Sequence, residues 1–241
     1  MLIKTRGIVF RTVKYGETSV IADIYTEELG LQSYILHGVR TKKPKFHSGL
    51  VQPMSLLDLV VYAREGKELH HVKELKSAFP FRSVPFVLLK GAVGSFMLEL
   101  SQKTVKESEA NPELFGFLFN TFVFLDETMH PVANTHLSFT VKLAGYLGIM
   151  PQAEIQTPDL YFDIRSGVFT TELLVHQHYM DKRESEILLQ LLQTRFTESH
   201  LIRLNSEERR KFLSDMLKFY EFHVPDFREM KSFSILQTVL S

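Results

Sequence analysis

Residues 30–53, GLQSYILHGVRTKKPKFHSGLVQP, decide the fold expected for the first part of the chain. The stretch begins as a strand, because its first side chains alternate between two faces. At His37 it turns into a polar loop with four cations, and it closes before a new apolar run. No acidic residue occurs between Leu29 and Leu57. A strand followed by such a basic loop favours binding of a polyanion, above all a nucleic-acid backbone.

Five short strands are expected around this stretch, each rich in β-branched and aromatic residues and bounded by turns. Their ranges are Leu2 to Val13, Ser19 to Thr26, Leu31 to Arg40, Met54 to Tyr62 and Glu68 to Leu75. One long connection follows the third strand. This arrangement is typical of a small closed barrel, of which the oligonucleotide/oligosaccharide-binding (OB) barrel is one design.

Beyond residue 80 the spacing of apolar residues becomes helical. Helix starts are expected at Pro85, at Asn111-Pro112-Glu113, near Val132, at Asp181 with Glu184 in a capping box, and at Ser206. A small hairpin, Leu160 to Asp163 with Val168 to Thr170, interrupts them, and the apolar tail from Phe227 is expected to pack on the helices. The chain is thus predicted to be an α+β protein. A five-stranded OB-type β-barrel covers residues 1–80, and a mainly α-helical domain with a hairpin insertion covers residues 81–241.

Composition narrows the class of protein. The hydrophobic share of 44 % excludes general disorder in a chain of 241 residues. No apolar run approaches the ~20 residues that span a bilayer, and the first residues lack a signal-peptide core, so no membrane contact and a cytoplasmic location are expected. The chain has no cysteine, which excludes disulfides and thiolate zinc sites.

The net charge of zero conceals an asymmetry between the two halves. Residues 1–82 carry 13 Lys and Arg against 8 Asp and Glu, whereas the remainder carries 15 against 20. A basic N-terminal part and an acidic C-terminal part suggest separate tasks, although random scatter of charge is an alternative.

Catalytic motifs are absent from the sequence. It contains no phosphate-binding G-x-x-x-x-G-K-[ST] loop, no G-x-G-x-x-G after a strand and no G-x-S-x-G elbow. Adjacent His70 and His71 point to opposite faces of a strand, and His176 and His178 lack a supporting set of carboxylates. Neither an enzyme nor a metal site is therefore expected.

The positive signal for function is the placement of cations and exposed aromatic rings on the barrel. Lysine and arginine neutralise phosphates, and aromatic rings stack on bases. The candidate nucleic-acid-binding residues are Arg11, Lys14, Tyr15, Arg40, Lys42, Lys43, Lys45, Arg64 and Lys67. Further stacking platforms are expected at Tyr34, Phe46 and Tyr62, with burial of each ring as the alternative.

Three segments together resemble a known family. They are VFRTVKYGETSVIADIYT at residues 9–26, residues 30–53 with their GVR and GLVQP motifs, and LAGYLGIMP at residues 143–151. Their order and spacing resemble the RecO family of bacterial recombination mediators over the whole chain. The resemblance implies a phosphate-contacting role for Arg11 and Arg40, and turn-setting roles for the glycines.

The resemblance also implies a function: a non-enzymatic, nucleoid-associated repair protein that binds single- and double-stranded DNA and anneals complementary strands. Its implied partners are RecR, the acidic C-terminal tail of single-strand-binding protein and, indirectly, RecA. For the tail, a pocket formed by Lys142 with Leu118 and Phe122 is the candidate. An adaptor barrel without DNA binding and an unrecognised hydrolase are the alternatives.

The chain departs from the family pattern after residue 151. Many members carry four cysteines there that form a zinc site, and residues 151–179 contain none. No zinc and no other cofactor is therefore expected. The hairpin in residues 152–180, the counterpart of that zinc segment, is expected to be held by Leu160, Phe162, Val168 and Phe169.

Overall fold

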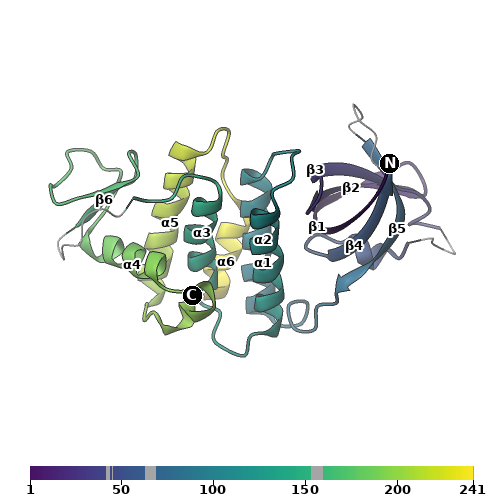
Figure 1. The fold of residues 1–241 in the computed structure, drawn as a ribbon. Coiled ribbons are helices and arrows are strands. Elements are labelled where there is room, and N and C mark those ends of the chain that lie inside the picture. The colour runs from purple at the N-terminus through teal and green to yellow at the C-terminus, as the bar shows by residue number, and fades with distance from the viewer. Residues whose placement is uncertain (42–43, 45, 63–68, 153–159, 241) are drawn as a thin grey trace. The chain divides into compact units, whose positions relative to one another are not determined.

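The computed structural model describes residues 1–41, 44, 46–62, 69–152 and 160–240 (Figure 1). They form two compact units. The first unit joins Met1–Pro85 with Val105–Glu127, and the second joins Phe86–Thr104 with Thr128–Ser241. The first unit therefore takes in a segment that follows the barrel in sequence, and the domain boundary expected after residue 80 stays a prediction.

The first unit contains the expected barrel, and this prediction is confirmed. Its strands are β1 (Leu2–Tyr15), β2 (Ser19–Thr26), β3 (Gly30–Leu36), β4 (Leu56–Tyr62) and β5 (Leu69–Phe79). They close in the order β1-β2-β3-β5-β4. The pair β3–β5 is parallel and the other pairs are antiparallel. Figure 1 shows these strands in the purple and blue of the N-terminal residues.

Two strand ends differ from the prediction by four residues, and the other described strand limits agree within two residues. Strand β3 ends at Leu36 rather than at Arg40, because Gly38 has a φ of +73° and turns the chain. Strand β5 continues past Leu75 to Phe79, because it stays paired with β4 up to Leu56 after a bulge. The local sequence does not reveal that bulge.

The long connection between β3 and β4 closes one end of the barrel interior. It contains the short helix η1 (Ser48–Val51). Val39, Phe46 and Val51 are 4 %, 6 % and 2 % exposed and belong to the same apolar cluster as the inward-facing strand residues. The Thr12 hydroxyl also donates to the Val51 carbonyl (2.6 Å). Val39, Phe46 and Val51 of the connection are therefore part of the core.

Helix α2 (Pro112–Glu127) covers part of the outer wall of the barrel. The Phe10 and Tyr25 rings stack at 5.7 Å, and Tyr25 lies 6.0 Å from the Phe115 ring. The guanidinium of Arg6 lies over Phe115 and Phe119, 5.4 and 4.8 Å from their centroids. This second apolar layer explains why outward-facing residues of β1 are buried.

The predicted start of α2 is confirmed, and a second side chain fixes its end. The Asn111 side chain accepts a hydrogen bond from the Leu114 amide (3.0 Å). Near the other end, the Asp126 carboxylate accepts from the amides of Arg82, Ser83 and Val84. Burial opposes ionisation of Asp126, but these donors hold the pKa of its carboxyl below the usual value.

The second unit contains the remaining helices and a small sheet. The helices are α1 (Leu88–Thr104), α3 (Thr135–Tyr146), α4 (Lys182–Gln193), η2 (Phe196–Leu201), α5 (Ser206–His223) and α6 (Lys231–Leu240). Helix α1 contacts α3 and α6, which confirms that the apolar tail packs on the bundle. The Glu99 carboxylate accepts from the Lys231 and Ser232 amides (3.0 and 2.7 Å) and so fixes the start of α6. None of the helices in the described ranges is long and apolar enough to cross a membrane.

Besides that of α2, two helix starts were predicted closely and two were not, since α3 begins at Thr135 rather than near Val132. The capping box of Asp181 and Glu184 is present, and Asn205 with Glu208 forms another before Ser206. The first helix begins at Leu88, three residues after Pro85. The helix start predicted at Pro85 is too early, because the fixed φ of proline suits a turn as well as the first position of a helix.

The small sheet confirms the predicted hairpin and adds a strand. Strands β6 (Tyr161–Asp163) and β7 (Val168–Thr170) pair as expected, and β8 (Tyr179–Met180) pairs with β6. Leu160, Phe162 and Phe169 are buried, as predicted. Val168 is 37 % exposed, so its expected core role is wrong. The reason is strand alternation, which turns Val168 to the face opposite Phe169.

One carboxyl in the second unit is buried next to other charges. Glu184 is 3 % exposed, and its carboxylate accepts from the Lys211 ammonium (2.8 Å). Burial, opposed by Lys211 and reinforced by the carboxylate of Asp215, raises the pKa of Glu184 to about 7. Folding therefore couples to the protonation of this residue.

Replacing Gly30 with alanine should destabilise the protein by about 2–4 kcal/mol. Gly30 has a φ of +63°, and an added Cβ would lie 2.3 Å from the Glu109 carbonyl oxygen, which is backbone and cannot move aside. Urea unfolding measures the loss. As a control, Gly116→Ala lies in helix α2 with no atom near the new methyl group and should stabilise by about 0.5–1 kcal/mol. Equal stability of the Gly30→Ala protein and the wild type would contradict the close approach.

Replacing Glu184 with glutamine should flatten the pH dependence of stability. The folded pKa of about 7 exceeds the unfolded value, so the folded state holds a proton that the unfolded state releases between about pH 4.3 and 7. Wild-type stability should therefore fall over that range, by on the order of 2 kcal/mol from this group. Urea unfolding at pH 5, 6, 7 and 8 tests this. Glu186→Gln, at an exposed position of the same helix, should keep the wild-type slope. If the free energy of unfolding of the Glu184→Gln protein changes with pH as steeply as that of the wild type, Glu184 is not the source of the pH dependence.

Candidate nucleic-acid interface

One end of the barrel brings together the turn between β1 and β2 and the start of the basic connection. The Arg40 amide donates to the Thr18 carbonyl (3.1 Å), and the Arg40 guanidinium donates to the Gly16 carbonyl (3.3 Å). Lys14 and Tyr15 end strand β1 beside this turn, and both are exposed. Lys14, Tyr15 and Arg40, predicted from separate stretches of sequence, therefore lie at the same end of the barrel.

Arg11 lies further along β1 on the outer face and is held by a neighbouring acid. Its Nε donates to Asp23 Oδ2 (2.8 Å) across the β1–β2 pair, and Ser33 Oγ donates to Asp23 Oδ1 (2.7 Å) from β3. The Arg11 side chain stays 68 % exposed. The ion pair fixes the guanidinium and partly neutralises it. Asp23 and Ser33 were not singled out from sequence, although strand alternation places both on the outer face.

Two of the four predicted stacking platforms are wrong. Tyr34 is 0 % exposed and Phe46 is 6 % exposed, because both side chains fill the barrel interior. Tyr15 and Tyr62 are 53 % and 41 % exposed and remain open to a base. Burial was the alternative prediction for each ring, and it is correct for Tyr34 and Phe46, which face the barrel interior.

Five candidate cations lie outside the residues that the structure describes. They are Lys42, Lys43, Lys45, Arg64 and Lys67. Their roles stay predictions from sequence. In an OB barrel, the loops between strands 1 and 2 and between strands 4 and 5 flank the binding face. Arg64 and Lys67 belong in sequence to the second of these loops.

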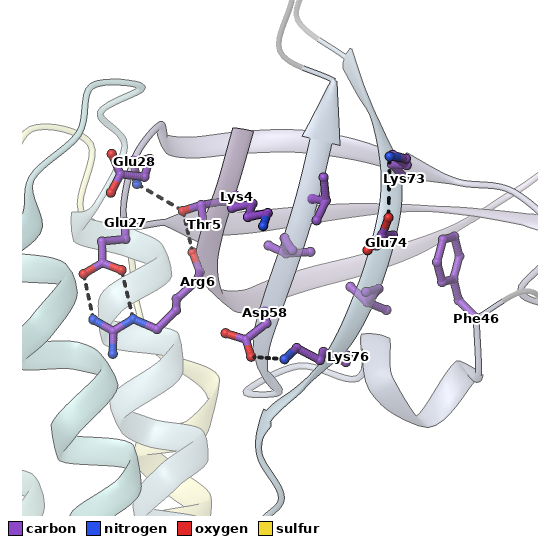
Figure 2. A pocket seen from close by; sticks show the side chains of 13 residues that line it. Lys4, Thr5, Arg6, Glu27, Glu28, Phe46, Asp58, Lys73, Glu74 and Lys76 are labelled. Carbon is purple, nitrogen blue, oxygen red and sulfur yellow. Dashed lines mark hydrogen bonds and ion pairs between the residues drawn. The ribbon is translucent and has the colours of Figure 1, made fainter. Parts of the chain in front are cut away.

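A separate hollow of about 830 Å³ opens on the β1, β4 and β5 side of the barrel (Figure 2). Its lining includes four cations and four acids: Lys4, Arg6, Lys73 and Lys76 with Glu27, Glu28, Asp58 and Glu74. Three ion pairs join residues of its lining: Arg6 with Glu27 (2.7 Å), Lys76 with Asp58 (3.3 Å) and Lys73 with Glu74 (3.6 Å). This balanced surface has little net attraction for a phosphate chain.

Comparison with known proteins identifies the family. The family model described as "Recombination protein O N terminal" matches residues 1–81, and "Recombination protein O C terminal" matches residues 86–232. The chain belongs to the RecO family. A relative from Bacteroides fragilis, named DNA repair protein RecO, is 34 % identical over 98 % of both chains. Relatives with the same name from Phocaeicola vulgatus and Christiangramia forsetii are 31 % and 33 % identical over 100 % and 99 % of both chains.

Membership of the RecO family supports a role for the chain in DNA repair and recombination. It also agrees with the architecture, a closed five-stranded barrel followed by helices and a small sheet. The resemblance read from the sequence motifs is thereby confirmed.

The candidate tail pocket of this RecO-family chain is less open than the sequence suggested. Leu118 and Phe122 are 0 % exposed and belong to the first unit, whereas Lys142 belongs to the second. The Lys142 ammonium donates to the Leu192 carbonyl (2.8 Å), and burial lowers its pKa. Buried side chains do not offer a free apolar wall, so Leu118 and Phe122 act as core residues in the described state. A partner contact at Lys142 stays a prediction.

The described ranges contain no cluster of side chains with metal-binding geometry. In residues 1–41, 44, 46–62, 69–152 and 160–240, no group of three or more His, Asp or Glu side chains is placed to hold an ion. His176 Nε2 lies 3.5 Å from Asp163 Oδ1, a contact between two side chains within the small-sheet region. The absence of zinc from the protein stays a prediction.

Proposed function

We propose that this RecO-family protein is a DNA repair and recombination mediator that binds single- and double-stranded DNA and anneals complementary strands. The observation that supports it most is the meeting of Lys14, Tyr15 and Arg40 at one end of an OB-type barrel. Cations for phosphates and an exposed ring for a base are the two needs of a single-strand groove. The connection that carries Arg40 also contains three further lysines.

The proposed mechanism of annealing is electrostatic. Two single strands repel each other, and cations bound to their phosphates reduce that repulsion while releasing counterions. The barrel end supplies the cations, and exposed Tyr15 supplies a stacking surface that tolerates any base. No covalent step is needed, so the protein acts without being an enzyme.

In the cell the protein would work with other recombination proteins. We propose that it assists RecA loading together with RecR and single-strand-binding protein, whose acidic C-terminal tail it would recognise. Residues 83–241 carry an excess of acidic residues, 20 against 15 Lys and Arg, which favours DNA contact at residues 1–82 and leaves the later residues for protein contacts.

An adaptor barrel that binds protein and no DNA is the second candidate. The charge-balanced hollow around Lys4 and Asp58 favours it, since mixed charges suit a polypeptide better than a phosphate chain. The two functions use different faces of the barrel, and a DNA-binding measurement separates them.

Replacing Arg40, Lys42, Lys43 and Lys45 together with alanine should weaken DNA binding and lower its salt dependence. The slope of log K against log salt concentration should fall by about 0.7–0.9 for each phosphate that the variant no longer neutralises. Fluorescence anisotropy of a labelled oligonucleotide between about 50 and 300 mM salt, a range over which phosphate binding weakens strongly, measures the slope.

The hollow provides a control of the same charge type on another face of the barrel. The variant Lys4→Ala/Lys76→Ala removes two cations from the balanced face and should leave the slope nearly unchanged. An equal loss in both variants would mean that only the overall charge matters. If the wild-type protein does not bind the oligonucleotide at the lowest salt concentration, the result would favour the second candidate, an adaptor barrel that binds protein and no DNA.

Replacing Lys142 with glutamate should weaken binding of an acidic peptide with the sequence of the single-strand-binding protein tail by about tenfold or more, because like charges would meet. Isothermal titration of the full-length protein measures it. Lys142→Met keeps the aliphatic stem and should cause a smaller loss, and thermal unfolding checks that both variants fold. Unchanged affinity in a folded Lys142→Glu protein would remove Lys142 from the tail site.

A further inference from the structure

Two histidines form a stacked pair on the outside of the barrel. The ring centroids of His37 and His71 are 5.6 Å apart, with 27° between the ring planes. Both side chains are exposed. The Ser19 hydroxyl lies 3.1 Å from His37 Nδ1 and fixes that ring. Packing does not call for imidazoles here, since the neighbouring core is apolar and lies on the inner side of the sheet.

The pair lies beside the proposed DNA surface. Strand register joins β3 to β5 through Ile35 and His71, and His37 follows Ile35 by two residues on the same face. On β4, exposed Tyr62 is directly opposite His71. On the other side, Tyr15 is opposite Ser19, the residue that holds His37. Imidazole and phenol rings therefore follow one another around the same end of the barrel.

Arg40 connects this row of rings to a phosphate-binding charge. It follows His37 by three residues, and its guanidinium is tied to Gly16 in the turn after Tyr15. Spaced rings next to a cation are the arrangement that single-strand grooves use. Imidazole adds one property that phenol lacks, because it gains a positive charge between about pH 8 and 5.

Given DNA binding at this barrel as proposed above, we infer that the His37–His71 pair is part of the single-strand contact surface and makes binding pH-dependent. In mildly alkaline solution the neutral rings offer a stacking face. As the pH falls, each ring that takes up a proton can neutralise one phosphate and release a counterion. Phosphate next to the rings favours the protonated form, so DNA and protons bind cooperatively.

Other titratable and charged groups face the pair from each neighbouring element. In the described part of the chain they are Tyr15 and Glu17 of the β1–β2 hairpin, Arg40 of the connection, Tyr62 of β4 and Lys73 of β5. The phosphate of a bound strand adds negative charge directly at the rings.

The test is a pH titration of affinity with the full-length protein and a labelled oligothymidylate. Anisotropy at pH 8, 7 and 6 in about 0.1 M salt should show wild-type binding tightening by up to about fivefold for each imidazole that gains a phosphate contact. The variant His37→Gln/His71→Gln should lose most of this gain. The variant His37→Phe/His71→Phe should keep the affinity at pH 8 and also lose the gain.

A second stacked histidine pair supplies the control. The ring centroids of His130 and His200 lie 4.1 Å apart in the second unit. The DNA affinity of the His130→Gln/His200→Gln protein should change with pH as it does for the wild type. If the His37→Gln/His71→Gln protein tightens with falling pH as much as the wild type, the inference fails while the proposed function stands. If the wild type binds no DNA at any pH, the proposed function itself fails. Should the Gln variant not fold, the Phe variant still decides, because a full pH gain without imidazoles would overturn the inference.

Discussion

The end of the barrel that is proposed to bind DNA depends on apolar side chains in the connection between β3 and β4. Val39, Phe46 and Val51 enter the barrel interior, and each fully buried side chain of this size contributes roughly 1.5–3 kcal/mol. Lys42, Lys43 and Lys45 lie in sequence between two of these anchors. The hydrophobic core therefore fixes the described residues on both sides of these lysines.

In the described part of the barrel, surface cations have two kinds of surroundings: some are paired with acids, and others are not paired with an acid. Around the hollow, Arg6 and Lys76 are each matched by an acid within 3.3 Å, and such pairs have little field beyond a Debye length. At the other site, Arg40 bonds to a carbonyl and keeps its full charge. Equal numbers of cations on two faces of one barrel can thus have different consequences, because the position of the acids decides which face attracts an anion.

The sequence predicted those features that depend on local chemistry. Asn111 and Asp181 cap helices as expected, since capping needs only residues three positions away. The roles of Tyr34 and Phe46 were misassigned, because an aromatic ring in a strand or connection can face either way until the register is known. Leu118 was proposed as the wall of a pocket, and the structure shows it buried. Helical periodicity identifies an apolar stripe but not the surface that covers it.

Helix α2 and the segment before it make the barrel unit discontinuous along the chain. The Leu31 amide bonds to the Glu107 carbonyl (3.0 Å), and Phe115 covers Tyr25 on the barrel wall. A fragment that stops at residue 80 would leave those aromatic side chains facing water and inviting self-association. During synthesis, the barrel must likewise wait for about 50 more residues before its wall is covered. The barrel unit therefore cannot be completed before helix α2 has been synthesised, and a shorter nascent chain leaves part of the barrel wall uncovered.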